Sequence, residues 1–494
     1  MLITKRVLWI LVTLLCVLFA PMAAEFYLVL HTNTTPTYAR VLSALVSHDY
    51  AMGETSGMTE MTPYWKSMPR LNQILLGLHA ALATVSLVLG PFLLSGSIRN
   101  RWPRIHRKMG RIYFGFGTVA ILLSIAYLLL TPLERVYGGR PFAIGLWGIA
   151  ILTLYTFVMG FFHIVRGEVE QHRAILLLNF CALLIAPLLR LWWLVLGRLF
   201  METPGNTQAN NHVAVLLFLG LQTVIAAIVS MSLFTRGPAA SRPPTASILR
   251  LRSRTRAVLP QLTSFALAAG ILLALGLLHQ SVLRLLGGGD LFAAFRPTAT
   301  LERELEVFAT HPLFFWARAL GLAGIWILAP LLIRRVFSPT PHHANRTLPV
   351  LFGLSILCAC AGWFGLAAGY GTEGIRGWGS AIYWGTVATS MLILFAFWGW
   401  GLATGHARRV REFTLHLYAL ALTPLTVGLM QWAFLRGGFP WGDAFLSAGV
   451  TGTSFNLSLS YYYTVYGSHA PSPSPEAPRP AQTSSSPLIA ATPS

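Results

Sequence analysis

The chain has 494 residues, of which 55% are hydrophobic and only 11% are charged, and its formal net charge is +20. Soluble domains carry roughly 25% charged residues, so this composition excludes an ordinary soluble domain and indicates an integral membrane protein. The cations lie in short segments between apolar runs, as in membrane proteins generally. The positive charge therefore sets orientation in the bilayer and does not indicate nucleic-acid binding.

The predicted elements are helices throughout. The apolar runs are about 20 residues long or longer, enough to cross a hydrocarbon core of ~30 Å at 1.5 Å per residue. We predict an all-α polytopic transmembrane bundle of about twelve spans. The first six cover 7–30, 71–96, 110–131, 142–164, 173–199 and 212–234. The second six cover 260–286, 311–335, 347–370, 378–403, 412–435 and 444–466.

The N-terminal run has an alternative interpretation. Lys5 and Arg6, an apolar run and then the small residues before 25 could form a cleaved signal peptide. The apolar run resumes through 26–30, however, and is long enough to span. We therefore expect a retained first helix.

The two halves of the chain resemble each other. A shift of 237 residues brings Pro187 onto Pro424, and a shift of 239 brings Pro91 onto Pro330. Two nearly equal shifts indicate a duplicated six-helix unit with one small insertion. Because each unit has an even number of helices, the two tandem repeats are expected to have parallel orientation, related by an axis along the membrane normal.

Charge predicts the orientation and the domain limits. The segments 97–111 and 235–259 each carry six Lys or Arg residues and no acid. In a twelve-span arrangement they fall on one side, which places both termini in the cytoplasm of a bacterial inner membrane. The predicted parts are the first repeat, a basic cytoplasmic linker, the second repeat and a Pro/Ser-rich tail expected to be disordered. They cover 1–234, 235–259, 260–466 and 467–494.

Three polar residues within the first-half spans are ligand-binding candidates. Asn179 and Arg190 are 11 positions apart, so they share a face if the span 173–199 is straight. His79 lies at similar depth on the span 71–96. Since ionisable groups in a membrane are costly, we predict that these residues line an intramembrane cavity. The alternative is structural: Arg190 snorkels or caps a carbonyl, and His79 makes one interhelical hydrogen bond.

His106, His163 and His172 lie near helix ends at the predicted cytoplasmic side. Imidazoles ligate haem iron and other transition metals, so these residues are haem or metal candidates. The alternative is a set of interfacial histidines beside anionic lipid headgroups. No carboxylate or fixed ligand spacing supports a metal. The second half lacks this set, and its polar positions are Arg318, Arg409 and His416.

A family resemblance rests on these residues. The pattern consists of His79 with Gly90-Pro91, then His106-Arg107-x-x-Gly110-Arg111-x-Tyr113, then His172-Arg173 with Asn179 and Arg190. Over roughly 71–195 it resembles the predicted bacterial membrane-protein family labelled domain of unknown function 2306. The resemblance implies a membrane protein and no particular activity. The string from His106 to Gly110 is loosely similar to dihaem cytochromes b. Those proteins need two histidine pairs, and His79 has no obvious partner.

Three functions remain open. The first is transport or recognition of a small molecule or lipid in the cavity of His79, Asn179 and Arg190. The second is a haem b redox protein that uses His106 with His163 or His172 as axial ligands. The third is a structural or assembly protein without a ligand. The expected partners are the bilayer and anionic headgroups at the cytoplasmic face, and the sequence leaves enzymatic activity uncertain.

Overall fold

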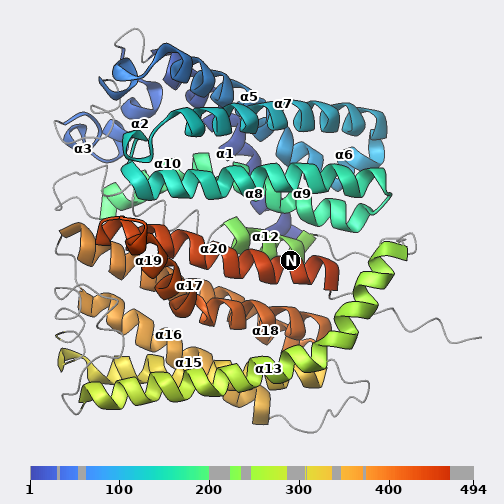
Figure 1. The fold of residues 1–494 in the computed structure, drawn as a ribbon. Coiled ribbons are helices and arrows are strands. Elements are labelled where there is room, and N and C mark those ends of the chain that lie inside the picture. Colours follow the sequence, from blue (N-terminus) through green and yellow to red (C-terminus); the bar gives the residue numbers. More distant parts are fainter. Residues whose placement is uncertain are drawn as a thin grey trace, which may run out of the picture.

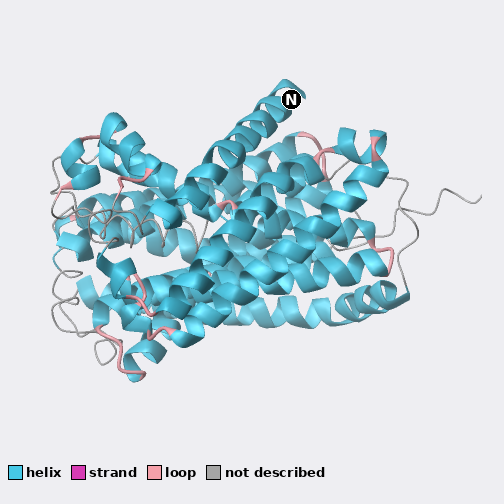
Figure 2. Cartoon of the chain, turned by 90° about the horizontal axis from the view of Figure 1, so that it is seen from above, coloured by secondary structure: helices cyan, strands magenta, loops and turns pink. Residues whose placement is uncertain are grey.

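The computed structural model describes residues 2–29, 34–53, 63–199, 223–234, 246–285, 306, 309–336, 347–370 and 374–467. Within these ranges every regular element is a helix and there is no strand (Figure 2).

The helices of the first half begin with one long N-terminal helix and two short ones. In order they are α1 (Leu2–Val29), α2 (Thr37–Leu45), α3 (His48–Met52), α5 (Arg70–Leu94), α6 (Gly96–Arg101), α7 (Pro103–Leu130), the 3-10 turn η1 (Leu133–Arg135), α8 (Gly139–Val165), α9 (Val169–Leu183), α10 (Ile185–Leu199) and α12 (Thr223–Phe234). Apolar runs did not predict α2, α3 or α6, because these helices are too short to span.

The helices of the second half are nearly all long. They are α13 (Ala246–Leu285), α15 (Pro312–Val336), α16 (Thr347–Tyr370), α17 (Gly374–Ala403), α18 (Ala407–Ala421), α19 (Thr423–Arg436) and α20 (Trp441–Gly467). Residues 246–259, predicted as part of a linker, form the first turns of α13. Residues 468–494 of the predicted tail lie outside the described residues, as do 212–222 of the sixth predicted span.

Length and hydropathy define a helical membrane bundle, as the composition predicted. Among the described residues, nine helical segments are long and apolar enough to cross a membrane, or ten if α9 and α10 form one bent span. The helix α12 is shorter than these. The count of twelve spans and the duplication stay predictions.

The predicted helix 173–199 is not straight. The axes of α9 and α10 meet at 43°, with the break at Leu184. Pro187 explains the break, because it lacks an N–H and its ring excludes the carbonyl four residues earlier. The second half has a milder interruption at the matching proline: α18 ends at Ala421 and α19 begins just before Pro424, but Arg408–Arg436 still counts as one candidate span. The bend removes the straight face on which Asn179 and Arg190 were expected to align.

The described helices of the two halves pack in a similar order. The helix α5 packs against α1 and α7, and α8 packs against α7 and α9. Likewise α15 packs against α13 and α16, and α17 packs against α16 and α18. The helix α20 lies between the halves and contacts α8, α9 and α12 (Figure 1). The largest buried cluster accordingly contains residues of both halves, among them Ile175, Ile228, Trp326 and Phe352.

Two basic segments lie at the same end of the bundle. Figure 1 shows α6 and the start of α13 at the same end. Arg99 and Arg101 occupy the last turn of α6. We call this the basic end, and it is the end at which α7 and α9 begin.

Candidate functional site

The side chain of Asn179 makes hydrogen bonds that link three helices of the first half. It is fully buried on α9, and its Oδ1 accepts a hydrogen bond of 2.6 Å from the Tyr113 hydroxyl on α7. Its Nδ2 donates to the Thr156 hydroxyl at 2.8 Å and to the Thr153 carbonyl at 3.2 Å, both on α8. Because both ends of this amide are engaged within the protein, its geometry is that of a packing contact.

Replacing Asn179 with leucine is therefore expected to lower the free energy of unfolding by about 2 kcal/mol, because the buried Tyr113 hydroxyl loses its acceptor. Denaturant unfolding of the detergent-solubilised protein, followed by circular dichroism, measures this change. The variants Y113F, N179L and the double variant form a cycle. If the two single losses simply add, the proposed coupling between these side chains is wrong.

His79 and Arg190 have separate partners. His79 Nδ1 donates to the Ala120 carbonyl of α7 at 2.7 Å. The Arg190 guanidinium lies 5.7 Å from the ring centre of Phe19 and 5.2 Å from that of Trp193, and donates to the Ala186 carbonyl at 3.3 Å. Among the described residues, no hydrogen bond or ring contact joins either side chain to the other or to Asn179. These contacts are of the kinds expected if both residues have structural roles: His79 makes an interhelical hydrogen bond, and Arg190 caps a carbonyl.

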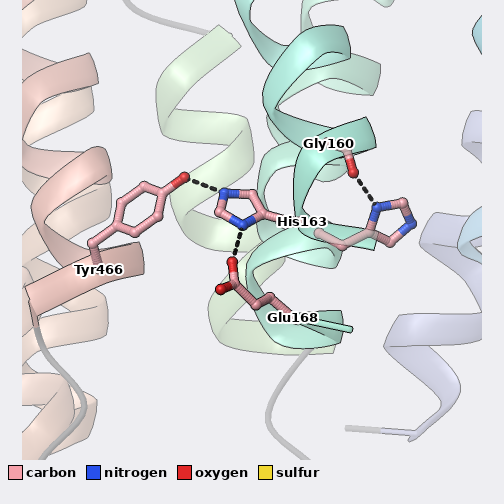
Figure 3. Close-up of polar contacts among 5 residues, drawn as sticks. Gly160, His163, Glu168 and Tyr466 are labelled. Atoms are coloured by element: carbon pink, nitrogen blue, oxygen red, sulfur yellow. Dashed lines mark hydrogen bonds and ion pairs between the residues drawn. The ribbon is translucent and has the colours of Figure 1, made fainter. Parts of the chain in front are cut away.

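At the basic end, the buried side chain of His163 makes polar contacts with two other residues. Figure 3 shows these contacts. His163 Nδ1 lies 2.5 Å from the Glu168 carboxylate, and both side chains are 3% exposed. Its Nε2 lies 2.5 Å from the Tyr466 hydroxyl. With Glu168 ionised and the imidazole neutral, Nδ1 donates to the carboxylate and Tyr466 donates to Nε2. We call these three residues the relay.

A tight turn positions Glu168 against His163 in the relay. The helix α8 ends at Val165, and Gly167 adopts a left-handed φ of 73° before α9 begins. Glycine takes this conformation without the Cβ penalty. The turn brings Glu168 back onto His163. Sequence reasoning missed Glu168, although a glycine between a histidine and a glutamate at a helix junction was a usable signal. Nothing local marked Tyr466, which comes from the far end of the chain.

His106 and His172 lie near two arginines, Arg99 and Arg173. The positive charges of Arg99 and Arg173 act on His106, and those of His106 and Arg173 act on His172. His172 Nδ1 donates to the Gly160 carbonyl at 2.8 Å, and its ring stacks on that of Phe114. We call Arg99, His106, His172 and Arg173 the basic cluster.

A haem held by His163 does not fit this arrangement. An axial ligand needs a free ring nitrogen, and both nitrogens of His163 are engaged at 2.5 Å. Within the described ranges no group of three or more His, Cys, Asp or Glu side chains is placed to hold a metal ion. The pair of His106 and His172 stays a prediction for haem.

The second-half polar positions lie in different surroundings. His416 is buried between Ser460 Oγ at 2.9 Å and Thr464 Oγ1 at 3.4 Å. The Arg409 guanidinium stacks 3.8 Å from the ring centre of Trp400. Arg318 lies over Phe315 in the same way, at 4.5 Å. These are contacts within and between helices of the second half.

A groove of about 580 Å³ opens between the two halves. Its first wall comes from α9, α10 and α12, and its second from α16 and α17. The walls are mainly apolar, with Leu188, Trp192 and Phe364 among the lining side chains. Its polar groups include three hydroxyls along one face of α17, from Thr386, Thr389 and Ser390. None of the three ligand-binding candidates, His79, Asn179 and Arg190, lines the groove.

These features define a polytopic helical membrane protein. Residues 76–230 match the model of a family described as a predicted membrane protein, DUF2306. The match confirms the family resemblance for this part of the first half. No curated protein and no solved structure matches the chain.

Proposed function

We propose that the protein recognises or carries a lipid, or another small molecule with an apolar chain, in the groove between its two halves. The observation that carries the proposal is the groove itself, about 580 Å³ in volume with mainly apolar walls. Binding sites for small molecules have volumes of ~300–1,000 Å³, apolar linings and a few polar groups that fix orientation. The hydroxyls of Thr386, Thr389 and Ser390 are such groups.

The position of the groove supports the same conclusion. Proteins built from two parallel units commonly bind substrate where the units meet. On the first wall, Cys181, Leu184 and Ile185 line the groove on both sides of the α9–α10 break. The proposal moves the ligand from a cavity of His79, Asn179 and Arg190 to this interface, because those three side chains are engaged elsewhere. The engagement of His163 weighs against the alternative in which it holds haem.

The location of the protein is part of the proposal. A bacterial inner membrane, with both termini in the cytoplasm, agrees with the basic end formed by α6 and the start of α13 (Figure 1). Cytoplasmic leaflets carry anionic lipids, so this end would contact their headgroups.

Filling the groove tests the proposal. A Cβ added at Gly385 meets only Ala367 Cβ, at 4.0 Å, so leucine at this position projects into the groove without a backbone clash. Gly399 lies on the same helix, has no atom within 4 Å of an added Cβ and does not line the groove. The variant G399L is therefore a matched control with the same gain in helix propensity.

The probe is a photoreactive fatty acid incubated with purified protein in phosphatidylcholine nanodiscs. Wild type is expected to be labelled on α10 or α17, and G385L to lose labelling about tenfold while G399L keeps it. Elution as a single species in size-exclusion chromatography shows that each variant is folded. Equal labelling of the two folded variants, or labelling spread over the outer helix faces, would overturn the proposal.

A further inference from the structure

The basic cluster is assembled from three helices. Arg99 comes from α6, His106 from α7, and His172 with Arg173 from α9. Electrostatic interactions link Arg99 with Arg173, and they link both His106 and His172 with Arg173, so the cluster is centred on Arg173. Arg173 is about 12 Å along α9 from Cys181, the first residue of that helix to line the groove. The cluster is therefore separate from the proposed lipid site.

No acid neutralises the cluster among the described residues. Within the described part of the chain, no ion pair joins an acid to any of its four side chains. The nearest acids along the chain are Glu168, which binds His163, and Glu170, which is exposed. Burial, and after it the positive charge of Arg173, lowers the pKa of Arg99. The two half-buried guanidinium groups, Arg99 and Arg173, repel each other, and this is unfavourable unless an anion joins them.

Two buried nitrogen atoms in the cluster have no hydrogen-bond partner in the described part of the protein. They are His106 Nδ1 and Arg173 Nε. A buried polar group left without a partner costs about 1–3 kcal/mol, so native proteins seldom leave two at one place. Both belong to side chains that bind oxyanions, and the arginine fork can bind two phosphate oxygens at once.

The helix ends add to the attraction for an anion. The helices α7 and α9 both start at the basic end, and neither has a side-chain hydrogen bond capping its N-terminus. His106 and His172 each occupy the fourth position of their helix. The N-terminus of a helix carries a partial positive charge and favours phosphate or carboxylate groups.

We infer that Arg99, His106, His172 and Arg173 form a binding site for a phosphate group at the basic end of the bundle. The unesterified oxygens of a phosphate group accept several hydrogen bonds, so they suit donors that come from three helices. The phosphate is either that of an anionic lipid headgroup or a free phosphate. The inference does not depend on the lipid groove.

Matched charge variants test the site. The double variant R99Q/R173Q removes two cluster arginines, and R104Q/R107Q removes the same charge from exposed positions of the same region. Purified protein in neutral detergent is titrated with inorganic phosphate and, separately, with phosphatidylglycerol or phosphatidylcholine. The readouts are the melting temperature and bound mass in native mass spectrometry.

Wild type and R104Q/R107Q are expected to bind inorganic phosphate, phosphatidylglycerol or both, and R99Q/R173Q to bind at least about tenfold more weakly. Binding of inorganic phosphate identifies a site for free phosphate, and binding of phosphatidylglycerol alone identifies a headgroup site. Equal weakening in both variants, or no saturable binding to wild type, overturns the inference. Circular dichroism checks folding, and H106Q/H172Q provides a second variant if R99Q/R173Q unfolds. Fatty-acid labelling in the groove should not change, so the two proposals can fail separately.

Discussion

Replacement of His163 with leucine is expected to lower the free energy of unfolding by about 3–5 kcal/mol. The imidazole is the partner of Glu168, a carboxylate that is only 3% exposed. Leucine at this position leaves the carboxylate buried without that partner, and the Tyr466 hydroxyl loses the contact that links α20 to α8. Removing the hydrogen-bond partner of a buried carboxylate is among the most destabilising single changes in a protein.

The measurement is equilibrium unfolding in detergent by circular dichroism, with Y466F and the double variant H163L/E168L alongside. Y466F loses one hydrogen bond and is expected to cost about 1 kcal/mol. H163L/E168L should be more stable than H163L alone, because it removes the carboxylate together with its partner. If H163L is the more stable of the two, the relay does not hold this end of the bundle together.

The variant G362V is expected to lower stability by about 3 kcal/mol, or to prevent accumulation of folded protein. A Cβ added at Gly362 of α16 would lie 2.3 Å from the backbone nitrogen of Arg318 on α15. Gly321 of α15 faces Ala359 of α16 in the same way, also at 2.3 Å. Because backbone atoms cannot rotate aside, the two helices must separate. Small residues at such crossings are how membrane helices approach closely.

The matched control is G276V on α13, where an added Cβ has no atom within 4 Å. It makes the same substitution in a predicted span without a facing backbone. Yield and melting temperature of the purified variants give the comparison. Equal losses in G362V and G276V would show that valine itself, and not the contact of α15 with α16, causes the effect.

The fold class was predictable because its signals are local. Runs of apolar residues marked most of the long helices, and the predicted spans 71–96 and 347–370 nearly coincide with α5 and α16. The bend at Leu184 was missed even though Pro187 was in view, because a proline in a long apolar run can kink a membrane helix without ending the span. The candidate site was less predictable, because a straight face along 173–199 was assumed.

By itself, the sequence determined that this is a helical membrane protein, roughly where most of its long helices lie, and which segments carry the positive charge. Hydropathy and charge act over a few helical turns, so a single stretch of chain contains them. Only the tertiary structure decided which polar groups meet. The contact of His163 with Tyr466 joins residues 303 positions apart, and the groove arises where helices of the two halves fail to fill the space between them. Such contacts depend on helix rotation and packing, which side chains throughout the bundle set together.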